Sequence, residues 1–136
     1  MSFFLNKNNL SLRNIDELYV TNGPGSFMGI RASLMFAKTF KISTNKKVFV
    51  ASSFIFPSNG FEDGDFYINA SGNTSYITQI KNGNSIEVLG SQNIESNYDY
   101  LLIEKNPKFF LSLFEEIEFF NEIEPNYIKN PRIGNN

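Results

Sequence analysis

The sequence contains no histidine, no cysteine and no tryptophan among its 136 residues. Without cysteine there is no disulfide framework, thiol nucleophile or iron–sulfur site. Without histidine there is no imidazole ligand for zinc or haem and no Ser-His-Asp arrangement. These absences exclude most catalytic chemistry before any motif is considered.

Positive charge and long hydrophobic runs are also scarce. The 12 Lys and Arg residues are offset by 14 Asp and Glu residues, so the chain has no basic surplus for binding nucleic acid by itself. If RNA is involved, another chain is expected to supply the charge. No run of 18 apolar residues is present, and polar residues 6–9 interrupt the apolar start. We therefore expect a cytoplasmic protein with no membrane partner.

The apolar pattern of the first half predicts a strand–helix–strand unit. The end of a helix is expected over residues 1–9, and Ser52 is expected to cap a short helical turn that Pro57 ends. The two strands should be parallel, with the helix as a right-handed crossover. The unit is predicted to consist of Glu17–Thr21, about Met28–Ile42, and Val48–Ala51.

The second half predicts an antiparallel sheet followed by mixed elements. Turns are expected at Ser71–Asn73 and Asn82-Gly83, of which the second is the stronger hairpin signal. Its three strands are expected at Phe66–Ala70, Tyr76–Ile80 and Ile86–Leu89. After them we expect a buried strand over Tyr100–Ile103, a helix from Pro107 to about Phe120, and an extended tail over Glu124–Asn136. The apolar stripe of that helix would be Phe110, Leu113, Phe114 and Ile117.

One segment, Asn22–Gly29 (NGPGSFMG), concentrates residues of chemical interest. Its glycines permit positive φ or a close backbone approach, and Ser26 can cap the helix that follows. Exposed amides at a helix start can hold a phosphate. The spacing Gly-x-Gly-x-x-x-Gly matches neither the dinucleotide fingerprint nor the phosphate loop. We therefore interpret Gly23, Gly25, Ser26 and Gly29 as a structural turn, with a phosphate contact as the alternative.

The helix after this turn carries apolar residues around most of its circumference. One apolar face is enough to cover a sheet, and a chain this small can hardly bury a helix on all sides. A second face is therefore expected to meet another subunit. The apolar positions are Ile30, Ala32, Leu34, Met35, Phe36, Ala37 and Phe40.

The remaining candidates predict no site. Glu62–Asp65 has too few ligands for a calcium loop and is interpreted as a turn around Asp63-Gly64. Ser26 has no histidine to serve as its base, and Lys38, three helical turns on, points away from it, so a Ser-Lys hydrolase is not expected. We expect a solvated helix face to carry four acidic residues: Glu115, Glu116, Glu118 and Glu122.

The segment Leu18–Arg31 (LYVTNGPGSFMGIR) resembles the signature Gly-Pro-Gly-Ser-Phe-Thr-Gly-hydrophobic-Arg of the TsaB (YeaZ) family. These proteins are glycoprotease-like subunits of tRNA threonylcarbamoyladenosine biosynthesis. Further stretches resemble the family in the same order along the chain: Asn8–Asp16, Phe36–Lys38, Val50–Phe54 and Glu124–Lys129.

The resemblance implies an α/β protein of the actin-like, RNase H-like (ASKHA) fold, with a mixed sheet and flanking helices. Residues 1–57 would be a remnant of the N-terminal actin-like domain, and residues 58–136 a smaller C-terminal α/β domain with a tail. The family begins with a β-hairpin that carries an early Asp, and no such segment precedes the first helix here, so the sheet is expected to be incomplete at the N-terminus.

Two further departures concern chemistry. Met28 stands where the family signature has Thr, which removes a hydroxyl from the loop. The stretch Asn69–Tyr76 lies where the family often has Asp-Ala-Arg-x-x-Glu-Val-Tyr, and its three charged positions are uncharged here, at Asn69, Ser71 and Thr74. These losses indicate a scaffold with little residual ligand chemistry.

The function implied by the resemblance is that of a non-catalytic partner subunit in the synthesis of N6-threonylcarbamoyladenosine at position 37 of tRNA. The implied partners are a TsaD-like catalytic subunit and a TsaE-like ATPase, with tRNA contacted only indirectly and a homodimer when the chain is alone. No cofactor or metal is expected in this chain, since ATP and metal would belong to the partners. The implied interface residues are Phe4, Met28, Arg31, Ala32, Met35 and Lys38. The alternatives are a small actin-like nucleotide-binding enzyme and a degenerate fragment without function.

Overall fold

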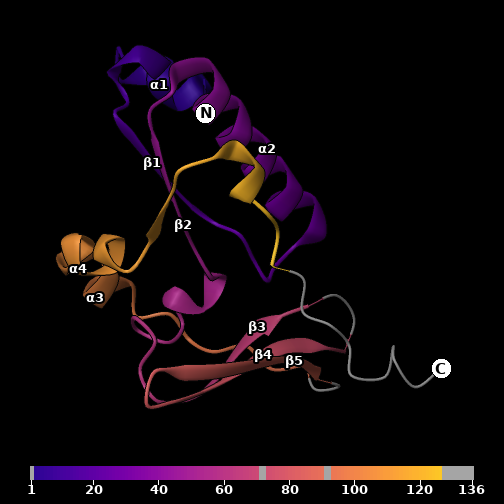
Figure 1. The fold of residues 1–136 in the computed structure, drawn as a ribbon. Coiled ribbons are helices and arrows are strands. Elements are labelled where there is room, and N and C mark those ends of the chain that lie inside the picture. The colour runs from indigo at the N-terminus through magenta and orange to yellow at the C-terminus, as the bar shows by residue number, and fades with distance from the viewer. Residues whose placement is uncertain (1, 71–72, 91–92, 127–136) are drawn as a thin grey trace.

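One sheet of the fold is mixed and has three strands, two from the start of the chain and one from near its end (Figure 1). The computed structural model describes residues 2–70, 73–90 and 93–126. Strands β1 (Glu17–Thr21) and β2 (Lys47–Ala51) are parallel, and β6 (Glu115–Ile117) pairs antiparallel with the other side of β2. The two predicted strands, their parallel pairing and the mixed sheet are confirmed.

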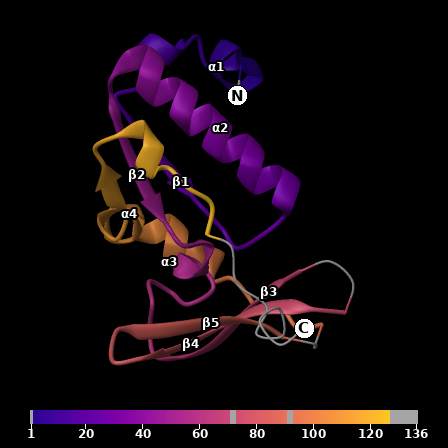
Figure 2. The same cartoon turned by 45° about the vertical axis from the view of Figure 1, so that its right-hand side comes forward.

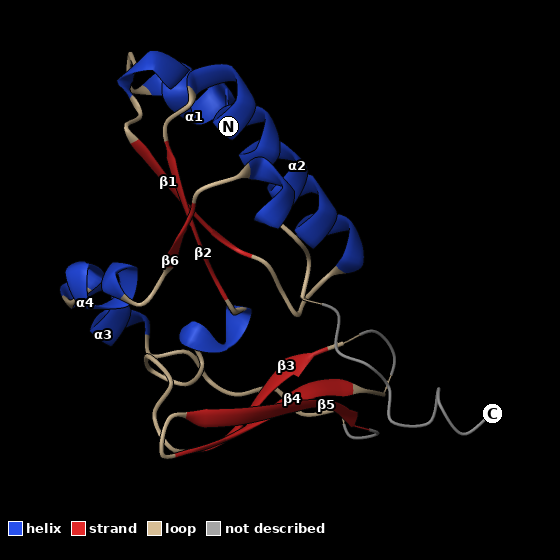
Figure 3. Cartoon of the chain, viewed as in Figure 1, coloured by secondary structure: helices blue, strands red, loops and turns tan. Residues whose placement is uncertain are grey.

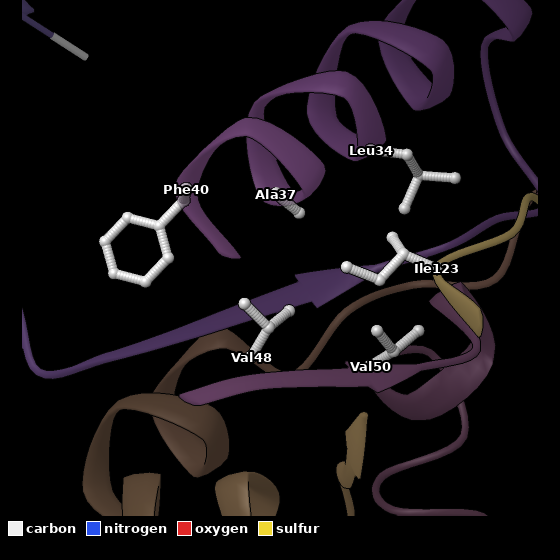
Figure 4. Packing of buried hydrophobic residues seen from close by; sticks show 6 residues of the cluster. All are labelled: Leu34, Ala37, Phe40, Val48, Val50 and Ile123. Atoms are coloured by element: carbon white, nitrogen blue, oxygen red, sulfur yellow. The ribbon is translucent and has the colours of Figure 1, made fainter. Parts of the chain in front are cut away.

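Helix α2 (Phe27–Thr44) covers one face of this sheet (Figure 4). Side chains alternate along a strand, so Val48 and Val50 of β2 both point towards α2. The helix ends at Thr44 and is followed by the C-cap residue Asn45, whose left-handed backbone (φ 53°) suits an asparagine at a helix C-terminus. The predicted crossover helix is confirmed. Its buried cluster consists of Leu34, Ala37, Phe40, Val48, Val50 and Ile123.

Helix α1 (Ser2–Lys7) lies beside the C-terminal end of α2 in both views of the ribbon (Figures 1 and 2). It buries Leu5 but leaves Phe3 and Phe4 exposed. A 3-10 turn, η1 (Leu12–Asn14), follows before β1. The predicted N-terminal helix is confirmed.

Helices α3 (Tyr100–Lys105) and α4 (Pro107–Ser112) lie on the opposite side of β2 from α2 (Figure 3). The buried strand predicted over Tyr100–Ile103 is therefore wrong. The carboxylate of Asp99 accepts a hydrogen bond from the Leu102 N–H at 3.0 Å, which caps a helix start. Tyr100 and Leu101 are 72% and 66% exposed, so the apolar run is not a core strand.

The helix predicted from Pro107 to Phe120 is also wrong in its second half. It ends at Ser112, and the chain then pairs with β2 as β6. Phe110 and Phe114 of the predicted stripe are buried, against Ala51 and Ile55. Glu115 and Glu116 are exposed as predicted, but they lie on this strand and not on a helix. Glu122 lies in a 3-10 turn, η3 (Phe120–Glu122).

The second sheet is an antiparallel meander of the kind predicted. Its hairpin turn is formed by Asn82 and Gly83, both with positive φ (52° and 79°), as a two-residue primed turn requires. The predicted turn at Ser71–Asn73 falls mostly outside the described residues, as does the tail beyond residue 126. The strands are β3 (Gly64–Asn69), β4 (Ser75–Lys81) and β5 (Asn84–Gly90).

The two sheets are joined through a short 3-10 turn, η2 (Ser53–Ile55). The hydroxyl of Ser52 accepts a hydrogen bond from the Phe54 N–H at 3.3 Å, so the predicted cap is confirmed. The division of the chain after residue 57 stays a prediction. Beyond that boundary, β6 and Ile123 pack with the first sheet. Among the described helices, none has the length and hydropathy of a membrane span.

Candidate functional site

The loop from β1 to α2 carries the signature residues, and Ser26 closes it. The Ser26 hydroxyl accepts a hydrogen bond from the Gly29 N–H at 3.3 Å, and its carbonyl oxygen accepts one from the Ile30 N–H at 2.8 Å. Both are contacts of a helix N-cap, which satisfies backbone donors that the first turn leaves unpaired. The predicted role of Ser26 as a cap is therefore confirmed.

Gly23 is the position in this loop where the backbone conformation requires glycine. Its φ is +105°, and a Cβ placed on it would lie 3.3 Å from the carbonyl oxygen of Asn126. Gly25 carries neither constraint, since its φ is outside the left-handed region and a Cβ would meet Ile30 at an ordinary 3.5 Å. The peptide bond between Gly23 and Pro24 is cis. Of the loop glycines, Gly23 is the one whose conformation requires the absence of a side chain.

Backbone hydrogen bonds tie this loop to the end of β2 and to the C-terminal segment. The Asn22 N–H donates to the Ala51 carbonyl at 3.0 Å, and the Ser53 N–H donates to the Gly23 carbonyl at 2.9 Å. From the other side, the Asn126 N–H donates to the Asn22 carbonyl at 2.8 Å. Three stretches that resemble the same family in sequence therefore meet in space.

Glu87 of β5 is a member of this junction that the sequence did not indicate. One of its carboxylate oxygens accepts a hydrogen bond from the Asn126 side-chain amide at 2.9 Å, and the other accepts one from the Ser52 hydroxyl at 3.5 Å. All three side chains are half-buried. Glu87 thus joins the second sheet to the loop junction. In the sequence Glu87 is a single charged residue in a hairpin strand, and nothing around it indicates a site. Its two partners, Ser52 and Asn126, do lie in stretches that resemble the family.

A pocket of about 390 Å³ opens beside the N-terminal end of α2. It brings the signature loop together with three residues, Asn69, Ala70 and Tyr76, of the stretch in which the family often carries three charges. Its lining offers a hydroxyl, an amide and a phenol, but no carboxylate and no cation, so it can form hydrogen bonds and apolar contacts without supplying an ionised acid or base. The predicted phosphate contact stays a prediction. The lining residues are Gly25, Ser26, Phe27, Met28, Asn69, Ala70 and Tyr76.

A second pocket, of about 320 Å³, lies where β1 and β2 end. The carboxyl ends of parallel strands are where α/β sheets bind their ligands. Asn22 and Ser52 follow the two strands, and Glu115 and Glu122 line the same pocket. Within the described part of the chain, no group of three acidic side chains is placed to hold a metal ion.

The outward face of α2 is apolar and open to solvent. Met28, Met35 and Ile42 are seven residues apart, so they follow one line along the helix, and they are 78%, 65% and 65% exposed. At the start of the helix, the Arg31 guanidinium lies 5.2 Å from the centroid of the exposed Phe27 ring. We call this surface, comprising Met28, Arg31, Ala32, Met35 and Ile42, the α2 face.

Most residues predicted for the partner interface lie on exposed surface. Met28, Arg31, Ala32 and Met35 are on the α2 face, and Phe4 of α1 is also exposed. Lys38 is half-buried at the border of the face. Their participation in an interface stays a prediction.

The mixed sheet and its crossover helix are those of an actin-like α/β protein. The sequence model of the family described as TsaD, tRNA N6-adenosine threonylcarbamoyltransferase, matches residues 1–101. The chain belongs to this family.

Solved structures share the fold. One is a crystal structure of an uncharacterized protein with similarity to peptidase YeaZ from Pseudomonas aeruginosa, at a TM-score of 0.58 and 17% identity, covering 94% of this chain and 80% of that one. Another is YeaZ from Pseudomonas aeruginosa, at a TM-score of 0.54 and 16% identity, covering 91% of this chain and 79% of that one. The predicted resemblance to YeaZ (TsaB) and the actin-like fold are thereby confirmed. None of the curated proteins matches this sequence.

Proposed function

We propose that this chain is a non-catalytic partner subunit in the synthesis of N6-threonylcarbamoyladenosine at position 37 of tRNA. In this proposal it binds and supports a TsaD-like catalytic subunit. The family to which the chain belongs is described as tRNA N6-adenosine threonylcarbamoyltransferase, which transfers the threonylcarbamoyl group. The proposal assigns the transfer itself to the partner.

The observation that carries the proposal is the α2 face. An exposed apolar row along a helix marks a site of protein interaction, because a monomer gains nothing from leaving it in water. Ala32 stands among the larger side chains, and a small residue lets a partner helix approach closely. Phe3 and Phe4 of α1, the helix that lies beside the C-terminal end of α2, are also exposed.

The chemistry of the chain supports a scaffold in preference to an enzyme. The sequence has no histidine or cysteine, and the lining of the pocket beside the signature loop has no ionised acid or base. The catalytic metal and the nucleotide therefore belong, in this proposal, to the partner subunits. A TsaE-like ATPase would join the pair, and tRNA would be bound through the complex.

In the absence of its partner the chain is expected to self-associate through the α2 face. The two-part division at residue 57 is part of the same proposal, with residues 1–57 forming the part that meets the partner. Such a complex would work in the cytoplasm, where tRNA is modified.

Reconstitution of the reaction tests the proposal. The TsaD-like and TsaE-like proteins of the same organism are incubated with tRNA, ATP and a threonylcarbamoyl donor, with and without this chain. Threonylcarbamoyladenosine is then measured by mass spectrometry of the nucleosides. We expect modification to depend on the chain, while the chain alone neither modifies tRNA nor hydrolyses ATP.

Two results would contradict the proposal. ATP turnover by the isolated chain, lost in Ser26→Ala, would favour the nucleotide-binding enzyme. Equal modification with and without the chain would favour a degenerate fragment.

A further inference from the structure

A hollow of about 570 Å³ lies on the segment that leads from the second sheet to α3. It shares no residue with the α2 face or with the two pockets near the signature loop. Its lining is Glu95, Ser96, Asn97, Tyr98 and Tyr100.

The segment that forms the hollow is held in place by the second sheet. The Ser96 N–H donates to the Tyr67 carbonyl at 3.0 Å, and the Ser96 hydroxyl accepts from the Tyr67 N–H at 2.8 Å. Two residues earlier, the Ile94 N–H donates to the Ser75 hydroxyl at 2.8 Å. Because the segment is already fixed in the free protein, a ligand would not have to order it.

The side chains of the hollow suit a flat cation. The rings of Tyr98 and Tyr100 are 5.6 Å apart at 32°, so they touch each other and leave no room for a group between them. Tyr100 is 72% exposed, so most of its side chain is open to solvent. The Glu95 carboxylate is exposed on the same segment. Burial, followed by the negative charge of Glu95, raises the pKa of Tyr98, so this carboxylate acts on Tyr98.

An arginine side chain is complementary to both the exposed tyrosine ring and the carboxylate. Its guanidinium is planar and stacks on an aromatic face, and it pairs with a carboxylate through several N–H donors. No residue of the lining is cationic, so nothing in the hollow repels it. We propose that this hollow binds an arginine side chain presented by a partner protein.

The surroundings favour a polypeptide over a free small cation. Leu101, which follows Tyr100, is 66% exposed, and Ile94 on the approach to the hollow is 41% exposed. Apolar residues next to an arginine in a chain could cover these side chains. The inference is independent of the proposed function, because it uses a different surface.

A titration of the whole chain with short capped peptides tests the proposal. The probes are acetyl-Leu-Arg-Leu-amide, the same peptide with citrulline in place of arginine, and acetyl-arginine-amide, followed by two-dimensional NMR. Citrulline has nearly the shape of arginine without its charge. We expect the arginine peptide to shift the resonances of residues 95–101 and to bind about threefold or more tightly than either other probe.

Variants localise the binding. Tyr100→Leu removes the exposed ring and Glu95→Gln removes the charge, and each should weaken binding by about threefold. Glu116→Gln, on β6 of the first sheet, is the matched control and should leave it unchanged. Equal affinity for the citrulline peptide, equal affinity for acetyl-arginine-amide, or an equal effect of Glu116→Gln would overturn the proposal.

Discussion

The backbone N–H of Asn126 donates a hydrogen bond to the carbonyl oxygen of Asn22 at 2.8 Å. The same two segments are joined by the Asn22 side-chain amide, which donates to the Glu124 carbonyl 102 residues along the chain at 3.2 Å. The start of the signature loop is therefore held by the C-terminal segment as well as by β2. The loop has little space on that side, and a Cβ on Gly23 would lie 3.3 Å from the Asn126 carbonyl oxygen.

Gly23→Ala is expected to destabilise the protein by about 1–3 kcal/mol, because alanine at a φ of +105° is strained and its Cβ would press on the Asn126 carbonyl oxygen at 3.3 Å. Gly25→Ala is the matched control, since its Cβ would make only ordinary contact with Ile30. Urea unfolding of the two variants measures the difference. Equal midpoints would show that the loop does not impose this demand.

Ser26→Ala is expected to cost about 0.5–2 kcal/mol, because it removes the acceptor for the Gly29 N–H at the start of α2. Ser33→Ala, at an exposed position inside the same helix, should cost nothing or stabilise slightly, since alanine favours helix. The comparison is made by thermal unfolding. A loss in Ser33→Ala as large as in Ser26→Ala would contradict the capping role.

Local sequence signals were enough to predict the first half of the fold. The run Glu17–Thr21 is flanked by turns and has strand-forming residues, and β1 has these same bounds. Ser26 was expected to cap a helix and Asn82-Gly83 to form a hairpin turn. Both do so in the structure. These predictions hold because each depends on a few neighbouring residues.

The second half shows where local signals fail. Tyr100–Ile103 is a short apolar run, which periodicity alone cannot assign to strand or helix. Asp99 before it was a cap signal that the prediction missed. Phe110 and Phe114 have helical spacing, but β2 offers an open edge to Glu115–Ile117, and this long-range pairing ends the helix. The contact of Glu87 with Asn126 likewise depends on the packing of distant segments.

Phe110→Ala is expected to destabilise the chain by about 3–5 kcal/mol, because Phe110 is 2% exposed in the cluster with Ala51, Ile55 and Phe114. Phe109→Ala serves as control. That neighbouring side chain is 50% exposed, and its loss should cost clearly less. Chemical unfolding monitored by circular dichroism compares them. A larger loss in Phe109→Ala would contradict the orientation of α4.

Tyr98→Phe is expected to make the free energy of unfolding less dependent on pH in alkaline solution. Burial raises the pKa of Tyr98 in the folded chain, so folding favours its neutral form. This contribution is complete below the unfolded pKa of about 10 and is lost as the pH rises through the higher folded value. The free energy of unfolding of the wild type should therefore fall more steeply above about pH 10 than that of Tyr98→Phe. Parallel pH profiles for the two proteins would show that Tyr98 does not contribute.

The most direct test of the proposed role measures binding of the TsaD-like protein to two variants of α2. Met35→Glu places a charge on the α2 face, and Ser33→Glu places the same charge on another exposed side of the same helix. Neither should change stability by more than about 0.5 kcal/mol, because both positions are exposed. An unpaired charge buried at the contact should weaken binding by about 3 kcal/mol, roughly a hundredfold.

Titration calorimetry with the TsaD-like protein gives the dissociation constants. The proposal predicts that wild type and Ser33→Glu bind alike and that Met35→Glu binds about a hundredfold more weakly. Equal binding by Met35→Glu and wild type would contradict the assignment of the α2 face as the partner interface.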